Sequence, residues 1–283
     1  MELHRIIKCD ARRSLRGCWG KSIAAAMVLF GSYLAVAISE SVLLFVFSEE
    51  SASLDFLSIT NASLTAIVIT GLAALAYFLL MPALSLGFTK LHLTFAEGRE
   101  ESVSVVFDMF SSFKWFVKSL AFTVALSLRY IFCAVIALLP GSVLFYLAET
   151  YIVTEDRTLQ LLKICACCVS IALMLLCLAL ALIYSQRWFA AGYYFVSGRK
   201  IHESFRLSVM ATKGMRTHIA GFKVSFVGWG LLNFLVLPVL WFLPYYSVSC
   251  AIYAKYLMEK LEHIPVEAPV TGSEPETEEE ENS

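Results

Sequence analysis

The sequence predicts an all-α fold: a polytopic membrane helical bundle of about six transmembrane helices, with amphipathic helices on its cytoplasmic side. Hydrophobic residues make up 59% of the 283 residues, and the mean hydropathy of +0.73 indicates that lipid surrounds much of the chain. Six apolar blocks each reach the roughly 20 residues that a membrane-spanning helix requires. Basic residues gather on alternate connections between these blocks. Barrel strands are excluded, because the blocks lack a two-residue alternation of polarity.

The chain divides into three regions. Residues 1–21 are predicted to form a basic amphipathic interfacial helix, and residues 22–260 a six-helix membrane domain. Residues 261–283 are predicted to be a disordered acidic tail, because almost no large apolar residue remains there. Such a tail either keeps the protein solvated or docks to a basic partner.

The N-terminal helix separates charge from apolar surface. At 100° per residue, Arg5, Lys8, Arg12 and Arg16 fall within one sector, and apolar side chains such as Ile7 lie largely opposite. A basic surface helix of this kind is attracted to anionic lipid headgroups. It serves either as an anchor of the topology or in specific lipid recognition.

The predicted membrane spans follow in order. They cover Ser22–Phe47, Leu64–Phe88, Ser119–Leu147, Leu161–Tyr184, Ile219–Leu237 and Val239–Met258. Pro238 and Pro244 bracket a very tight connection between the last two, which are therefore either two crossings or one re-entrant hairpin.

Two more amphipathic segments precede later spans. One covers Val103–Val117, with Val106, Phe110, Phe113 and Val117 on one side. The other covers Ile201–His218, where Arg199, Arg206 and Lys213 recur every seven residues and so share a face. The order of surface helix and helical hairpin thus recurs, without a residue-level repeat.

Orientation follows from the basic residues in short loops. Those predicted to be cytoplasmic precede the first span or lie between the second and third and between the fourth and fifth, for example Arg12, Lys118 and Lys200. The opposite loops are acidic, with Glu49 and Glu155 among their residues. Both termini are therefore expected in the cytoplasm, and the protein in the plasma membrane.

Arg129 is the candidate polar residue at membrane depth. It lies about 16 Å into the third predicted span, where a charge costs roughly 3 kcal/mol on insertion scales. Its partner is either Glu40, the one acid inside a predicted span, or a set of carbonyls, hydroxyls or lipid phosphate.

No catalytic residue, metal site or cofactor is predicted. Histidines, acids and nucleophiles form no catalytic arrangement, and Cys165 and Cys168 sit in an apolar helix without polar support. Because the basic residues track membrane topology, nucleic acid is not expected as a partner.

Several motifs resemble one family. They are Ala11-Arg-Arg-Ser-Leu-Arg-Gly-Cys-Trp-Gly-Lys21, Pro82-Ala-Leu-Ser-Leu-Gly-Phe88, Leu138-Leu-Pro-Gly141, Glu203 to Gly214, Phe222-Lys-Val-Ser-Phe-Val-Gly-Trp229 and Leu243-Pro-Tyr245. Together, over about residues 5–260, they resemble an uncharacterised bacterial integral-membrane family, domain of unknown function 975. This family is similar in architecture to the membrane domains of some glycerophosphodiester phosphodiesterases. The stretch from Gly141 to Tyr184 looks longer than the family's usual connection.

In this motif set, Ser225, Gly228 and Trp229 are interpreted as helix-packing residues. The sequence then favours a non-enzymatic membrane protein that binds membrane lipids, anionic headgroups among them, or a membrane protein partner. Its candidate binding residues are Arg129, Glu40, Arg199, Arg206 and Lys213. The alternative is a small transporter or lipid-translocating protein that uses the intramembrane Arg129.

Overall fold

A computed structural model describes residues 2–47, 64–151, 157–231 and 239–263, which form helices without any strand among them. The long helices are α2 (Trp19–Phe47), α3 (Leu64–Ala96), α4 (Phe113–Tyr151), α5 (Arg157–Ser185) and α10 (Val239–Glu262). The short ones are α1 (Glu2–Ser14), η2 (Val103–Phe110), η3 (Gln186–Trp188), α6 (Ala191–Val196), α7 (Ile201–Ala211), α8 (Arg216–Val224) and α9 (Val227–Leu231). The all-α prediction is confirmed.

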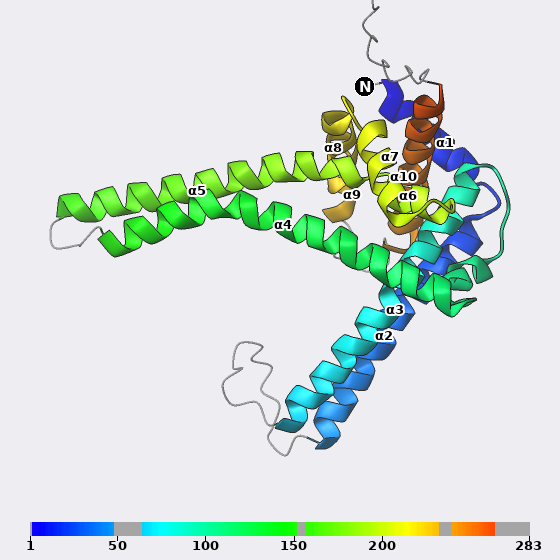
Figure 1. Ribbon diagram of the computed structural model, residues 1–283, viewed down its shortest axis with the longest axis horizontal. Helices are drawn as coiled ribbons and strands as arrows, with labels where there is room; N and C mark the ends of the chain where they lie inside the picture. Colours follow the sequence, from blue (N-terminus) through cyan, green and yellow to red (C-terminus); the bar gives the residue numbers. More distant parts are fainter. Residues whose placement is uncertain (1, 48–63, 152–156, 232–238, 264–283) are drawn as a thin grey trace, which may run out of the picture.

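Two antiparallel hairpins project from one compact end (Figure 1). The hairpins are α2 with α3 and α4 with α5, here called the arms. The compact end, here called the head, contains α1, η2, η3, α6, α7, α8 and α10 together with the adjoining ends of α2, α3 and α4. The loops at the arm tips, residues 48–63 and 152–156, lie outside the described residues.

Four described helices are long and apolar enough to cross a membrane: α2, α3, α4 and the stretch Arg157–Val196 that includes α5. Their most apolar windows are only 6–17% buried within the protein. In water this surface would be unfavourable, so lipid is the environment that its composition fits.

The helices of the arms extend further than their apolar blocks. Helix α3 continues from the predicted end at Phe88 to Ala96, and α4 begins at Phe113 rather than Ser119. The added turn of α3 is buried by protein, with Leu91 and Phe95 at most 1% exposed. These ends belong to the head, which is why hydropathy alone placed the boundaries too early.

The third hairpin differs from the arms. The predicted span Ile219–Leu237 breaks at Ser225 and Phe226 into α8 and α9, and residues 232–238 lie outside the described part. Helix α10 begins at Val239, as predicted for the sixth span, but it packs inside the head, with Ala251, Tyr253 and Leu257 fully buried. Four helices in the described part of the chain are long and apolar enough to cross a membrane. The six crossings expected from the sequence therefore remain a prediction.

Helix α1 buries its apolar stripe in protein rather than in lipid. Ile7, Ala11 and Leu15 follow at steps of four and are at most 2% exposed. The imidazole of His4 packs edge-on against Phe222, with ring centroids 5.5 Å apart, and its burial lowers the His4 pKa. The basic face stays outside, so α1 can meet headgroups through its charges.

The other two amphipathic predictions need correction. Residues 103–117 do not form one helix, because the 3-10 helix η2 ends at Phe110 and α4 begins at Phe113. Three residues per turn place Val106 and Met109 of η2 in the core. Phe113, the first residue of α4, is 81% exposed. The segment 201–218 divides into α7, which ends at Ala211, and α8, which begins at Arg216; Gly214 lies between them with a φ of +77°, as suits a helix stop.

Local backbone geometry recurs along the chain. Helices α3 and α6 both end in Phe-x-x-Gly-Arg, where Gly98 and Gly198 have positive φ and donate to Phe95 O and Phe195 O. The turn between α1 and α2 also matches the turn between α7 and α8. Gly17 and Gly214 both have positive φ. In each turn, the residues just before and just after the glycine donate their N–H groups to the carbonyl three residues earlier. The turns that join surface helices to hairpins therefore have the same backbone hydrogen bonds at both places in the chain.

The predicted tail, residues 261–283, lies almost wholly outside the described residues. Its first part, to His263, closes α10 through an N–H donated to Glu259 O at 3.1 Å.

Candidate functional site

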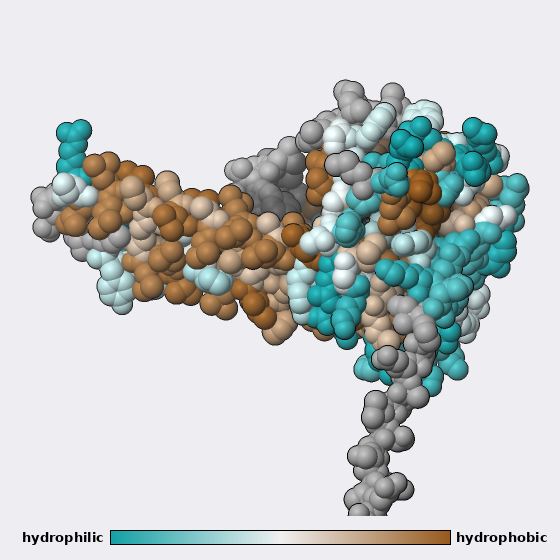
Figure 2. Space-filling view, turned by 90° about the horizontal axis from the view of Figure 1, so that it is seen from above, coloured by the Kyte–Doolittle hydropathy of each residue, from teal (hydrophilic) through white to brown (hydrophobic). Residues whose placement is uncertain are grey.

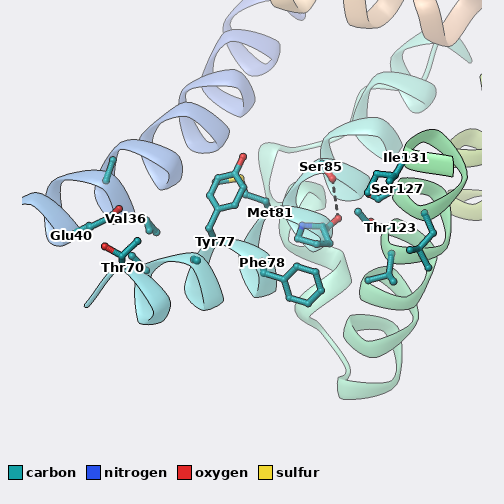
Figure 3. Close-up of a pocket in the computed structure, with 16 residues that line it drawn as sticks. Val36, Glu40, Thr70, Tyr77, Phe78, Met81, Ser85, Thr123, Ser127 and Ile131 are labelled. Atoms are coloured by element: carbon teal, nitrogen blue, oxygen red, sulfur yellow. Dashed lines mark hydrogen bonds between the residues drawn. The ribbon is translucent and has the colours of Figure 1, made fainter. Parts of the chain in front are cut away.

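A groove of about 840 Å³ lies where the two arms separate (Figure 3). Helix α3 forms its base, α2 one wall and α4 the other. Its lining is mainly apolar, with small residues such as Ala73 and Ala74 next to Phe78 and Met81. Volumes of roughly 300–1,000 Å³ are typical of small-molecule sites.

Helices α2 and α3 pack against each other beside the groove. Tyr33 and Tyr77 meet edge to face with ring centroids 5.7 Å apart. Pro82 leaves the helix ladder of α3 without one N–H, and the Ser85 hydroxyl donates to the Pro82 carbonyl at 3.0 Å. The groove thus lies beside a part of α3 that departs from regular hydrogen bonding.

A few polar side chains occupy defined positions along the groove. Glu40 stands toward the arm tip, and Thr123, Ser127 and Ser85 lie toward the head (Figure 3). The groove consequently has an apolar middle and polar groups at both ends, which suits an amphiphile better than a fully apolar ligand.

The head carries the charge of the molecule. Figure 2 shows an apolar α4/α5 arm beside a largely hydrophilic head. Ion pairs tie its segments together: Lys21 Nζ lies 3.2 Å from Glu100, and Lys90 Nζ lies 2.6 Å from Asp108. The three segments predicted to be cytoplasmic, which contain α1, η2 and α7, all lie in the head.

Arg129 lies outside the groove lining. Its guanidinium donates to the Ala125 carbonyl at 2.7 Å and stacks over the Phe205 ring at 3.9 Å. Within the described residues it forms no ion pair with Glu40, which lines the groove instead. Of the two predicted kinds of partner, the geometry shows a carbonyl, and Arg129 joins α4 to α7.

The basic residues around α7 are exposed. Arg199 forms an ion pair with Glu203 at 3.3 Å and is 56% exposed in its side chain. Arg206 and Lys213 are also exposed, although only Arg206 lies within α7 itself. The structure does not bring these three to the groove, so they can serve only as surface contacts.

Ser225 lies at the break between α8 and α9, and Gly228 and Trp229 lie within α9. The Ser225 hydroxyl donates to the Phe222 carbonyl at 2.5 Å. A Cβ at Gly228 would meet no described atom within 4 Å, and Trp229 is 62% exposed. Close helix approach occurs instead at Gly87, against the backbone of Val106, and at Gly141, against Ser170 and Met174.

A second, polar cavity in the head was missed by sequence reasoning. It has a volume of about 230 Å³ and is lined by His92, Tyr193, Lys223, Tyr246 and Cys250 among others. One signal was available, because Lys223 interrupts an apolar block only four residues after its predicted start. Throughout the described ranges, no three His, Cys, Asp or Glu side chains are arranged to hold a metal ion.

Residues 1–260 match the family described as "Protein of unknown function (DUF975)". No curated protein and no solved structure matches the chain.

Proposed function

The chain belongs to the DUF975 family of proteins of unknown function, and on that premise we propose what it does. We propose that the protein is a non-enzymatic, multi-pass membrane protein that binds a membrane lipid, and that the acyl chain of this lipid lies in the groove between α2, α3 and α4. The single observation that supports this is a large, mainly apolar groove whose helices expose apolar surface to the surroundings.

An acyl chain is favoured over other occupants for a physical reason. The groove opens between helices that are themselves exposed to lipid, so chains surround it at high local concentration. Its small side chains on α3 leave room for a flexible chain, and association within lipid depends on such close packing rather than on the hydrophobic effect.

The charge distribution supports the plasma membrane with the head in the cytoplasm. Exposed basic residues concentrate on the head, for example Arg13, Lys114 and Lys200. At the tip of the α4/α5 arm, Lys163 is neutralised by Glu149 at 2.9 Å. An excess of basic residues on one side favours that side as cytoplasmic.

Lipid translocation is the second candidate. It is favoured by the polar side chains at both ends of the groove, from Glu40 to Ser85. A headgroup crossing an apolar core needs such groups on its path, because an unsatisfied polar group there costs several kcal/mol. Transfer of a fluorescent lipid between leaflets of reconstituted vesicles is the expected activity.

A bulky substitution inside the groove tests the proposal. Ala74→Trp fills the groove, whereas Ala35→Trp places the same bulk on an exposed position of α2 outside its lining. Native mass spectrometry of the detergent-extracted protein should show retained phospholipid in the parent and in Ala35→Trp, and a loss of most of it in Ala74→Trp.

Equal lipid retention by both tryptophan variants would contradict the groove as the binding site. Thermal unfolding of each variant serves as the control, since a lower retention counts only where the protein remains folded.

A further inference from the structure

The polar cavity in the head contains a cation without a counter-charge. Lys223 is partly buried, and its Nζ lies 4.9 Å above the Phe189 ring. Among the described residues, no carboxylate lies within ion-pair distance of this ammonium. A cation removed from water is stabilised only when an opposite charge or good hydrogen bonds replace its hydration.

Neutral hydroxyls surround Lys223. Tyr193, Tyr246 and Ser247 line the same cavity from α6 and α10. The ammonium and these hydroxyls give the cavity wall several hydrogen-bond donors, which is the kind of lining that the acceptor oxygens of a phosphate require.

The remaining polar wall is already satisfied. His92 Nδ1 bonds to the Phe88 carbonyl and Nε2 to the Ser22 hydroxyl, both at 2.7 Å. This residue is 1% exposed. His92 therefore fixes the shape of the cavity, and Lys223 is left as the group that still lacks a charged partner.

The cavity lies on the same face of α3 as the groove. Phe78, Met81, Pro82 and Ser85 line the groove, and Phe88, Thr89 and His92 line the cavity. Steps of three and four residues keep them on one face. At the junction, the Thr89 hydroxyl donates to the Ser85 carbonyl at 2.9 Å, one helical turn away.

We propose that the Lys223 cavity binds the phosphate of a phospholipid whose acyl chain lies in the groove. This inference rests on the proposed function, because it assigns the headgroup of the same lipid. A cavity of about 230 Å³ accommodates a headgroup but not the whole molecule, so the chain must continue elsewhere, and the groove is the adjacent space.

Matched ligands separate the two parts of the site. We would titrate the full chain in detergent with dioleoyl phosphatidic acid, with dioleoylglycerol, which lacks the phosphate, and with inorganic phosphate, and follow binding by native mass spectrometry. The parent protein should bind phosphatidic acid about 10-fold or more tightly than dioleoylglycerol, as expected for one charged hydrogen-bonded contact.

Variants then assign the charge. Lys223→Gln should abolish the preference for phosphatidic acid while binding of dioleoylglycerol persists, and Lys223→Arg should retain part of the preference. Lys260→Gln removes one charge from the exposed surface of the same head and should leave the preference intact. Ser247→Ala, which removes one donor, should weaken it and remains informative where Lys223→Gln does not fold.

Each other outcome has a definite meaning. A preference retained in both Lys223→Gln and Ser247→Ala, or lost equally in Lys260→Gln, would overturn the cavity as the phosphate site. Saturation by inorganic phosphate with no gain from acyl chains would overturn the lipid as its source. If the parent protein binds phosphatidic acid through Lys223 but does not bind dioleoylglycerol, the result would contradict the groove as the site of the acyl chain.

Discussion

Gly87 has the closest packing contact of any glycine in the described part of the chain. A Cβ built there would lie 2.0 Å from the Val106 carbonyl oxygen and 2.6 Å from its carbonyl carbon. Both atoms belong to the backbone of η2, which cannot turn aside as a side chain can. The absence of a side chain at Gly87 therefore allows η2 to cover the head end of α3.

We expect Gly87→Ala to destabilise the protein by about 1–3 kcal/mol, the usual cost of overpacking. Gly71→Ala is its control in the same helix, because a Cβ there meets no described atom within 4 Å. Unfolding midpoints in detergent should fall for the first and stay equal or rise slightly for the second, since alanine favours helix over glycine. Similar midpoints for the two variants would contradict the η2 contact.

Single charged residues were the hardest to interpret from sequence. Depth along a hydropathy profile singled out Arg129, yet its guanidinium is satisfied by a carbonyl of its own helix and an aromatic ring of α7. Lys223 lies inside a motif whose other residues, Ser225, Gly228 and Trp229, predict helix packing. Which lysine or arginine lacks a partner depends on residues from α6, α8 and α10 that are distant in sequence.

At the scale of elements, α1 shows how an amphipathic pattern can be read in two ways. Its sequence separates charged from apolar residues, a pattern that is typical of a helix at a lipid interface. The apolar face contacts α10 and α8 instead, with Tyr245 donating to the Lys8 carbonyl at 3.4 Å. Amphipathicity identifies a face to be buried but not the partner that buries it.

Adjacent isoleucines test this docking. Ile7 is 2% exposed against the head, whereas Ile6 is 55% exposed. Ile7→Asp should release α1, because an unpaired carboxylate in that position costs about 3 kcal/mol or more. Trypsin should then cleave at the arginines of α1 much faster than in the parent. Ile6→Asp should leave the cleavage rate nearly unchanged, and equally fast cleavage of both would show that α1 is not docked.

At the scale of the whole molecule, the arms and the head separate apolar from charged surface. Their tips and the head should lie on opposite sides of the membrane. Thr158, at the start of α5, and Ser197, at the end of α6, are both exposed and report on these two sides. The alternation of charge along the sequence already predicts this arrangement.

Cysteine labelling measures it directly. In a background without the native cysteines, Thr158→Cys should react with a membrane-impermeant maleimide in intact cells. Ser197→Cys should react only after the cells are permeabilised. The reverse pattern would mean an inverted protein, and labelling of both in intact cells would mean that the two positions share one side.

Hydropathy predicted the arms well and the head poorly. The four spans of the arms have the simplest signal, an uninterrupted apolar block, and their helices were found within a few turns of the predicted ends. In the head, α8 and α10 combine apolar residues with polar and charged ones, because protein and not lipid surrounds them. A single sequence does not show which helices pack together or where they leave space between them, so the groove and the Lys223 cavity could not be predicted.

The contact between the two ends of the chain has a consequence for synthesis. Lys8 and Tyr245 are 237 positions apart, so at about 5–20 residues per second the ribosome needs roughly 12–47 s to supply the partner of α1. During that interval both arms can enter the bilayer, and α1 is free to rest on the membrane with its apolar face down. The final helix would then lift α1 from the lipid and close the head, so a stalled or truncated chain would remain inserted but unfinished.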